Sequence, residues 1–152
     1  GKDLLIELKS GAAIVPAFRR ELEKGILPLA QVVVIAFEFE LLRAVRAALP
    51  RVRVLHLAGG PDAGRPLPLS ELDALIAAAR AAGFDGLNLG DDWPWDAPMV
   101  KRIHQAGLRC YVWTVNEADR ARYLAGLGVD GITTDRPGFI RQRLPLTANH
   151  QK

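Results

Sequence analysis

Short apolar runs alternate along this chain with longer segments in which apolar residues recur every three or four positions. The short runs have the length of strands and occupy residues 4–9, 32–37, 52–57, 86–89, 108–115 and 131–134. The longer segments have the period of a helix and occupy residues 39–49, 72–82, 96–106 and 117–127. This alternation is typical of repeated βα units, so the pattern predicts six units and a parallel sheet.

The boundaries of these helices carry residues that start or stop a helix. Pro50 ends the first helix, because proline cannot donate the next backbone hydrogen bond. Gly83, Gly107 and Gly128 each follow a helix and precede a strand, which predicts that they cap the helices in the αβ loops. Ser70 begins a sequence that resembles a capping box and predicts the start of the second helix.

The size of the chain bounds the fold. A complete (β/α)₈ barrel takes about 250 residues, so six units in 152 residues have the right unit size but fall two units short. The sequence therefore predicts an α/β fold, a partial (β/α)₈ TIM barrel of about six βα units. We assign residues 1–144 to this one domain and expect residues 145–152 to form a frayed C-terminal tail.

Composition excludes several classes of protein. The formal net charge of +3 comes from scattered residues without a basic run, so we expect no nucleic-acid partner. Cys110 is the single cysteine, which excludes a disulfide framework and favours a small core residue in a strand. No apolar run approaches the roughly 18 residues of a membrane span and no signal-peptide pattern begins the chain, so a cytoplasmic location is the default expectation.

Two charged residues interrupt the apolar strand at residues 4–9. Because side chains alternate between the two faces of a strand, Glu7 and Lys9 share one face, and Leu4, Ile6 and Leu8 share the other. Charges that point into a barrel near its C-terminal mouth are costly unless they are paired, hydrated or bound to a metal. The two residues therefore form either a functional site or a structural ion pair, and their spacing leaves both interpretations open.

Four short motifs stand in a fixed order over nearly the whole chain. They are I-E-L-K at residues 6–9, I-A-F at 35–37, W-T-V-N at 113–116 and G-V-D-G-I-T-T-D-R-P at 128–137. Together they resemble the C-terminal part of a glycerophosphodiester phosphodiesterase domain. The resemblance implies a barrel enzyme that hydrolyses glycerophosphodiester substrates to glycerol 3-phosphate and an alcohol, with Mg²⁺ or Ca²⁺ as its cofactor.

The resemblance also implies roles for four residues. Glu7 matches the glutamate that binds the catalytic metal, and Lys9 matches the lysine that lines the phosphate site. Phe37 and Trp113 match aromatic residues that shape the substrate pocket, with Trp113 as an apolar wall. Ala36 stands where the family has a serine, which removes one hydroxyl near the pocket.

The chain departs from the family pattern in its proton-transfer residues. The family's barrel begins with a His-Arg pair, an E-x-D metal pair and a second histidine, and none of these stands at a matching position in this sequence, whose first strand matches the family's third. The first two βα units therefore have no match here. His56, near the end of a strand, is the one histidine placed to reach the mouth, and a bond to a backbone carbonyl is its favoured role. His104 and His150 are interpreted as surface or packing residues.

Polar residues after other strands have structural interpretations as well. The acidic loop at residues 91–96 has the composition to bind a hard cation, but a helix-capping turn with Asp96 at the N-cap, and tryptophans over the rim, is favoured. Asn116 is expected to cap the next helix, and Asp135 to fix a turn.

Two further hypotheses come from other functional classes. A sheet that lacks two strands leaves its first and last strands as open edges, which predicts a non-catalytic fragment or scaffold that forms homo-oligomers or needs a partner segment. A third possibility is a regulatory module that binds phosphoesters without hydrolysing them.

Overall fold

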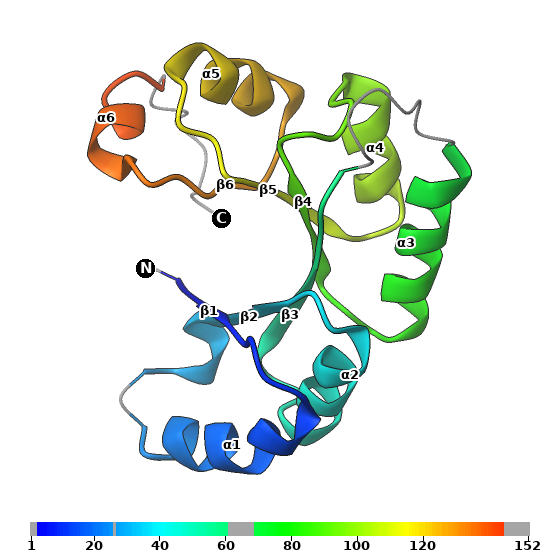
Figure 1. Ribbon diagram of the computed structural model, residues 1–152, viewed down its shortest axis with the longest axis vertical. Coiled ribbons are helices and arrows are strands. Elements are labelled where there is room, and N and C mark those ends of the chain that lie inside the picture. Colours follow the sequence, from blue (N-terminus) through cyan, green and yellow to red (C-terminus); the bar gives the residue numbers. More distant parts are fainter. Residues whose placement is uncertain (1–2, 26, 61–68, 145–152) are drawn as a thin grey trace.

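The six predicted strands form one parallel sheet in the computed structural model, which describes residues 3–25, 27–60 and 69–144. The strands pair in chain order: β1 (Leu4–Glu7), β2 (Val32–Ala36), β3 (Arg53–Ala58), β4 (Gly86–Gly90), β5 (Arg109–Trp113) and β6 (Gly131–Ile132). The sheet curls, with β1 and β6 at its two ends (Figure 1). The prediction of a partial barrel is confirmed. The expected tail at residues 145–152 lies outside the described residues.

Helices follow the strands and cover the outer side of the curled sheet (Figure 1). The longer ones are α1 (Val15–Glu23), α2 (Phe39–Ala48), α3 (Leu69–Ala81), α4 (Ala97–Gln105) and α5 (Ala118–Leu127). The short ones are η1 (Ala12–Ile14), η2 (Leu29–Gln31) and α6 (Pro137–Arg141). Four of the long helices match the predicted segments, whereas α1 and α6 lie outside them. Among the described residues, no helix is long and apolar enough to cross a membrane.

The two faces of the sheet carry separate apolar clusters. The cluster between sheet and helices includes the strand residues Val32, Val34, Val54, Leu87 and Cys110. A smaller cluster on the concave face consists of Val33, Ile35, Leu55, Leu57 and Tyr111. Neighbouring residues of one strand therefore belong to different clusters, as the alternation of side chains in a strand requires. The core position expected for Cys110 is confirmed, and its burial raises the pKa of the thiol to about 12.

Two αβ junctions share the sequence pattern Gly-x-Asp-Gly. Gly83 and Gly128 have φ values of 68° and 89°, in the left-handed region that favours glycine. Two residues later, an Asp carboxylate accepts a hydrogen bond from the backbone of the preceding strand: Asp85 from Val54 N at 2.7 Å and Asp130 from Cys110 N at 2.7 Å. Each aspartate directly precedes a strand and therefore ties the start of that strand to the start of the parallel strand beside it.

Two predicted helix starts have different outcomes. Asp96 is the N-cap of α4, and its carboxylate accepts a hydrogen bond from Met99 N at 2.7 Å, which confirms the prediction. Ser70 lies inside α3, one residue after its first helical residue, so the predicted start there is wrong. Helical backbone at Ser70 excludes the extended conformation that an N-cap residue takes.

Candidate functional site

A pocket of about 350 Å³ lies at the carboxyl ends of β1 and β2. Its lining consists of Glu7, Leu8, Lys9, Ser10, Phe37 and Glu38. Glu7 pairs with Ile35 in the parallel ladder, and Leu8 N donates to Ile35 O at 3.0 Å, so the segments that follow the two strands lie side by side. The pocket thus gathers three of the four residues for which the sequence predicted a site role, namely Glu7, Lys9 and Phe37.

Glu7 and Lys9 form an ion pair across this pocket. The Lys9 Nζ atom lies 3.5 Å from Glu7 Oε2, and the Lys9 side chain is 78% exposed against 33% for Glu7. Such an exposed pair contributes less than about 1 kcal/mol to stability, because water screens both charges. The interpretations as ion pair and as site are therefore compatible, since little free energy holds Lys9 to Glu7 when an anion competes for it.

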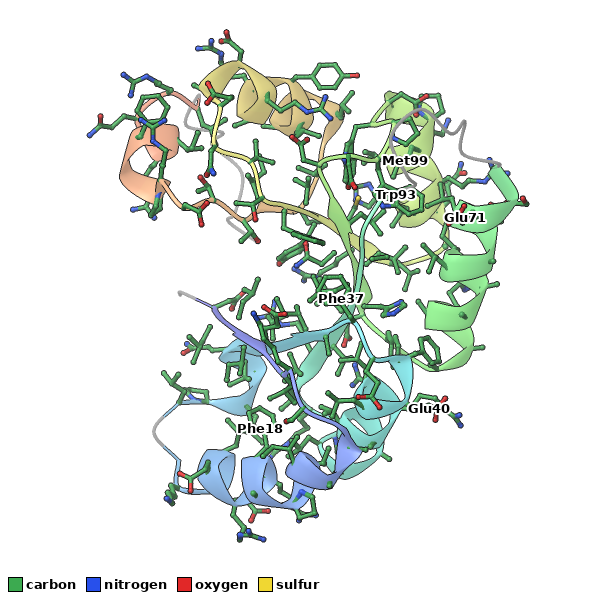
Figure 2. The ribbon with its side chains drawn as sticks, in the orientation of Figure 1. Phe18, Phe37, Glu40, Glu71, Trp93 and Met99 are labelled. Atoms are coloured by element: carbon green, nitrogen blue, oxygen red, sulfur yellow. The ribbon has the colours of Figure 1, made fainter. Side chains whose placement is uncertain are left out.

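Phe37 and Trp113 form the aromatic part of the site. Their ring centroids are 5.5 Å apart in an edge-to-face arrangement with an interplanar angle of 86°. The Trp113 indole donates to Asn88 O at 3.0 Å, which fixes the ring on the concave face. Phe37 is 53% exposed, and its side chain lies near the middle of the curled sheet (Figure 2). A large exposed aromatic ring beside a pocket offers apolar surface to a ligand.

The sequence reasoning missed Ser10 and Glu38, which also line the pocket. Glu38 is the residue before α2, but its side chain makes no capping hydrogen bond. Its Oε2 atom lies 3.8 Å from the position that a Cβ atom on Gly11 would take, so the carboxylate reaches across to the segment after β1. The available signal was its position directly after Phe37, beyond the end of a strand.

The described residues do not form a complete metal site. Among them, no group of three or more His, Cys, Asp or Glu side chains is arranged to hold a metal ion. Ca²⁺ takes six to eight oxygen ligands, and Mg²⁺ takes six, several of which are usually water or substrate oxygens. Glu7 therefore fits as a single ligand at most.

His56 lies on the helix side of β3, away from the pocket. Its ring packs edge-to-face on Phe39, with centroids 5.3 Å apart, and lies near Phe84. His56 Nε2 is 3.2 Å from Phe37 O, so the predicted role with a backbone carbonyl is confirmed. Burial lowers the pKa of His56, and the bond to Phe37 O opposes this only in part. This histidine is therefore not placed to exchange protons with a ligand in the pocket.

The lowered pKa of His56 predicts that stability falls in acid. Below about pH 6.5 the His56 imidazole binds a proton in the unfolded chain but stays neutral in the folded chain. The free energy of unfolding therefore decreases as pH falls from about 7 to about 5. His56→Phe, which matches the aromatic surroundings, is expected to flatten this decrease in urea titrations. The control His104→Gln, on exposed α4, keeps His56 and is not expected to flatten it. An equally steep decrease in His56→Phe would contradict the assignment.

Asn116 joins the ends of β5 and β6 rather than capping α5. Its Nδ2 donates to Asp135 Oδ2 at 2.8 Å, and its Oδ1 accepts from Asp135 N and Thr134 Oγ1, both at 3.0 Å. The N-cap of α5 is Glu117, without a side-chain hydrogen bond, so the predicted cap is wrong. The side chain has more partners in the turn after β6 than one cap offers. Asp135 accordingly takes part in fixing this turn.

The acidic loop at residues 91–96 is structural. Asp91 accepts from Arg120 Nε at 2.7 Å, and Asp92 accepts from Gly60 N at 2.9 Å. Trp93 and Trp95 are buried in the core cluster, as Figure 2 shows for Trp93. The helix-capping interpretation of this loop is confirmed, whereas the tryptophans lie in the core and not over the rim. His104 also has a structural partner, because its Nε2 lies 2.9 Å from Asp130 Oδ2.

Comparisons with known proteins all identify one family of phosphodiesterases. A sequence profile of the glycerophosphoryl diester phosphodiesterase family matches residues 15–139. YhdW of Bacillus subtilis (strain 168), named as a glycerophosphodiester phosphodiesterase, is 48% identical over 42 residues, which are 28% of this chain and 17% of that protein.

Solved structures show the same fold. A Silicibacter pomeroyi DSS-3 protein named as a glycerophosphoryl diester phosphodiesterase is 29% identical with a TM-score of 0.76, covering 92% of this chain and 49% of its own. An Oleispira antarctica phosphodiesterase, solved in complex with the product sn-glycerol-3-phosphate, is 20% identical with a TM-score of 0.74, covering 93% of this chain and 54% of its own. This chain therefore spans about half the length of these solved proteins.

Proposed function

Because this chain belongs to the glycerophosphoryl diester phosphodiesterase family, we propose that its pocket binds the phosphate group of a glycerophosphodiester for hydrolysis to glycerol 3-phosphate and an alcohol. The observation that carries the proposal is the gathering of Glu7, Lys9 and Phe37 in one pocket at the carboxyl ends of β1 and β2. In parallel barrels this end of the sheet carries the chemistry. The product complex of the Oleispira antarctica protein supports the choice of glycerol 3-phosphate.

Each pocket residue has a role in this proposal. The Lys9 ammonium contacts the phosphoryl oxygens, where a positive charge stabilises the ground state and the charge that develops in the transition state. Phe37 and Trp113 form an apolar wall beside the substrate. Glu7 is one ligand of a divalent cation, Mg²⁺ or Ca²⁺, and the described residues do not supply a cluster of three such side chains.

Hydrolysis of a diester also needs a group that accepts a proton and one that donates a proton. Neither histidine in the described part of the chain is available near the pocket, because His56 lies on the helix side and His104 bonds Asp130. The proposal therefore assigns substrate binding to the described residues and proton transfer to groups outside them.

The test combines binding with turnover. Glycerol 3-phosphate is expected to raise the melting temperature of the purified chain, and Lys9→Met is expected to remove the rise, whereas the exposed control Lys101→Met retains it. Release of glycerol 3-phosphate from glycerophosphocholine is then measured with and without Mg²⁺ or Ca²⁺, beside Glu7→Gln. We expect binding without turnover.

Two results would contradict parts of this proposal. If glycerol 3-phosphate neither raises the melting temperature nor perturbs NMR signals of pocket residues, the pocket is not a phosphate site. If the chain shows metal-dependent turnover that Glu7→Gln abolishes, the groups for proton transfer and metal binding lie within this chain, and the expectation of binding without turnover is wrong.

A second candidate function is a scaffold that assembles through its sheet edges. Within the described residues, β1 pairs only with β2 and β6 only with β5, so each has one edge without a partner strand. All strands run parallel, so β6 of one copy can extend the ladder of β1 in another copy without reversing direction. Leu4, 44% exposed on β1, adds apolar surface to this edge.

The oligomeric state tests this second candidate. Light scattering after gel filtration is expected to show a mass that rises with protein concentration, and Leu4→Lys is expected to reduce it, because charge on an edge strand opposes pairing. Leu27→Lys changes another exposed leucine outside the strands and is expected to have no effect. A monomer at all concentrations with a cooperative melting transition would exclude assembly through the edges.

A further inference from the structure

The side chains that line the pocket carry one positive and two negative charges. Glu7 and Lys9 neutralise each other at 3.5 Å. Glu38 lines the same pocket, and among the described residues its carboxylate has no hydrogen bond or ion pair, at its own helix start or elsewhere. In the absence of a metal ion at Glu7, the pocket therefore combines one cation with two carboxylates. A phosphodiester with no other charge is an anion, so Glu38 repels it unless the ligand also carries a positive charge.

The exposed aromatic ring lines the same pocket as this spare carboxylate. Phe37 precedes Glu38 in the chain, lines the same pocket and is 53% exposed. The Trp113 ring meets it edge-to-face at 5.5 Å, which holds the ring in place while leaving much of it open. A cation is attracted to the face of an aromatic ring, and a nearby carboxylate adds to the attraction. A quaternary ammonium suits such a site, because its methyl groups are apolar and it needs no hydrogen-bond acceptors.

We propose that Phe37 and Glu38 form a subsite for a positively charged alcohol group, so that the pocket selects zwitterionic glycerophosphodiesters, such as those with a quaternary ammonium alcohol, over anionic ones. This inference rests on the proposed function, because Lys9 must hold the phosphate of the same molecule. Lys9 and Glu38 follow neighbouring strands, so the pocket presents a positive and a negative group to the two opposite charges of the ligand. Lys9 then attracts the phosphate, and Glu38 attracts the positively charged alcohol group of the same substrate.

Two ligands that differ only in the alcohol test the subsite. Glycerophosphocholine and glycerophosphoglycerol share the glycerol phosphate, but only the first carries a positive charge. Binding is followed by NMR titration of the folded chain without added metal. We expect glycerophosphocholine to bind about tenfold more tightly, the difference that one moderately exposed cation–π and carboxylate contact supplies.

Variants identify the residues that produce the difference. Glu38→Gln and Phe37→Leu are each expected to bring the two affinities within about threefold of each other. The matched control is Glu40→Gln, two residues further along, where the side chain pairs with Arg43 and lies on the outer side of α2 (Figure 2). This control is expected to keep the tenfold difference. Circular dichroism confirms that each variant is folded.

The outcomes separate this inference from the proposed function. If the two ligands bind equally tightly, the subsite is absent while the phosphate site stands. If the Glu38→Gln variant keeps the full preference, another group recognises the cation and the assignment to Glu38 is wrong. If neither ligand binds, the proposed function fails and this inference fails with it.

Discussion

Replacing Gly86 by alanine is expected to lower the free energy of unfolding by about 3 kcal/mol. A Cβ atom at this position would lie against the carbonyl oxygen of Arg109 and 2.9 Å from Arg109 Cβ. Arg109 is the partner of Gly86 in the ladder between β4 and β5, so the atom in the way is backbone. Arg109 N donates to Asp85 O at 2.9 Å, so the two backbones cannot separate without lengthening this hydrogen bond, and the strain remains. Urea denaturation followed by circular dichroism measures the loss.

The control for this substitution is Gly126→Ala on α5. No heavy atom outside its own helix lies within 4 Å of the added Cβ. Alanine is the better helix former, so this variant is expected to be unchanged or about 0.5–1 kcal/mol more stable. If Gly86→Ala lies within about 0.5 kcal/mol of the parent chain, then β4 and β5 do not approach as closely as described.

Replacing Trp113 by alanine is expected to cost about 3 kcal/mol and to release Phe37. The indole packs on the concave cluster, donates to Asn88 O at 3.0 Å and meets the Phe37 ring edge-to-face. Its removal leaves a cavity at the carboxyl end of β5 and takes away the support of the aromatic wall. The free energy of unfolding from urea curves gives the first effect. NMR signals of Phe37 report the second.

Trp113→Phe separates the ring contact from the hydrogen bond. Phenylalanine keeps an aromatic ring beside Phe37 but cannot donate to Asn88 O, so we expect a cost of about 1 kcal/mol. The ring signals of Phe37 should stay close to those of the parent chain. If both variants are equally destabilised, the hydrogen bond and not the packing holds the ring, and the role of Trp113 as a wall would need revision.

The face on which the charged residues of the first strand lie was predictable from the sequence, and the face of His56 was not. From Ile6 to Lys9, apolar and charged residues alternate, so the face of Glu7 and Lys9 follows from strand geometry alone. In β3, both faces are apolar, because parallel strands are covered on two sides. Alternation then cannot tell which face points into the barrel. The contact of His56 with Phe39 and Phe84 decides this, and those residues come from other elements.

The roles of Asn116 and Glu38, which follow strands, also could not be predicted from the local sequence. An asparagine before a helix is a good N-cap on local grounds, yet its partners Thr134 and Asp135 are 18 and 19 residues away. Glu38 also precedes a helix and does not cap it. The local sequence predicts that each of these side chains caps the following helix. Only the neighbouring strands show which other groups the side chain approaches.

By itself, the sequence determined the order of the six strands and of four long helices, the glycines that end the helices and the face on which Glu7 and Lys9 lie, because each depends on residues a few positions apart. The repeated Gly-x-Asp-Gly pattern also carried a signal for the roles of Asp85 and Asp130. Only the tertiary structure decided that Glu38 joins the pocket, that His56 is buried away from it and that Asn116 bonds the turn after β6. These contacts depend on which strands become neighbours, and that is settled by the curling of the whole sheet.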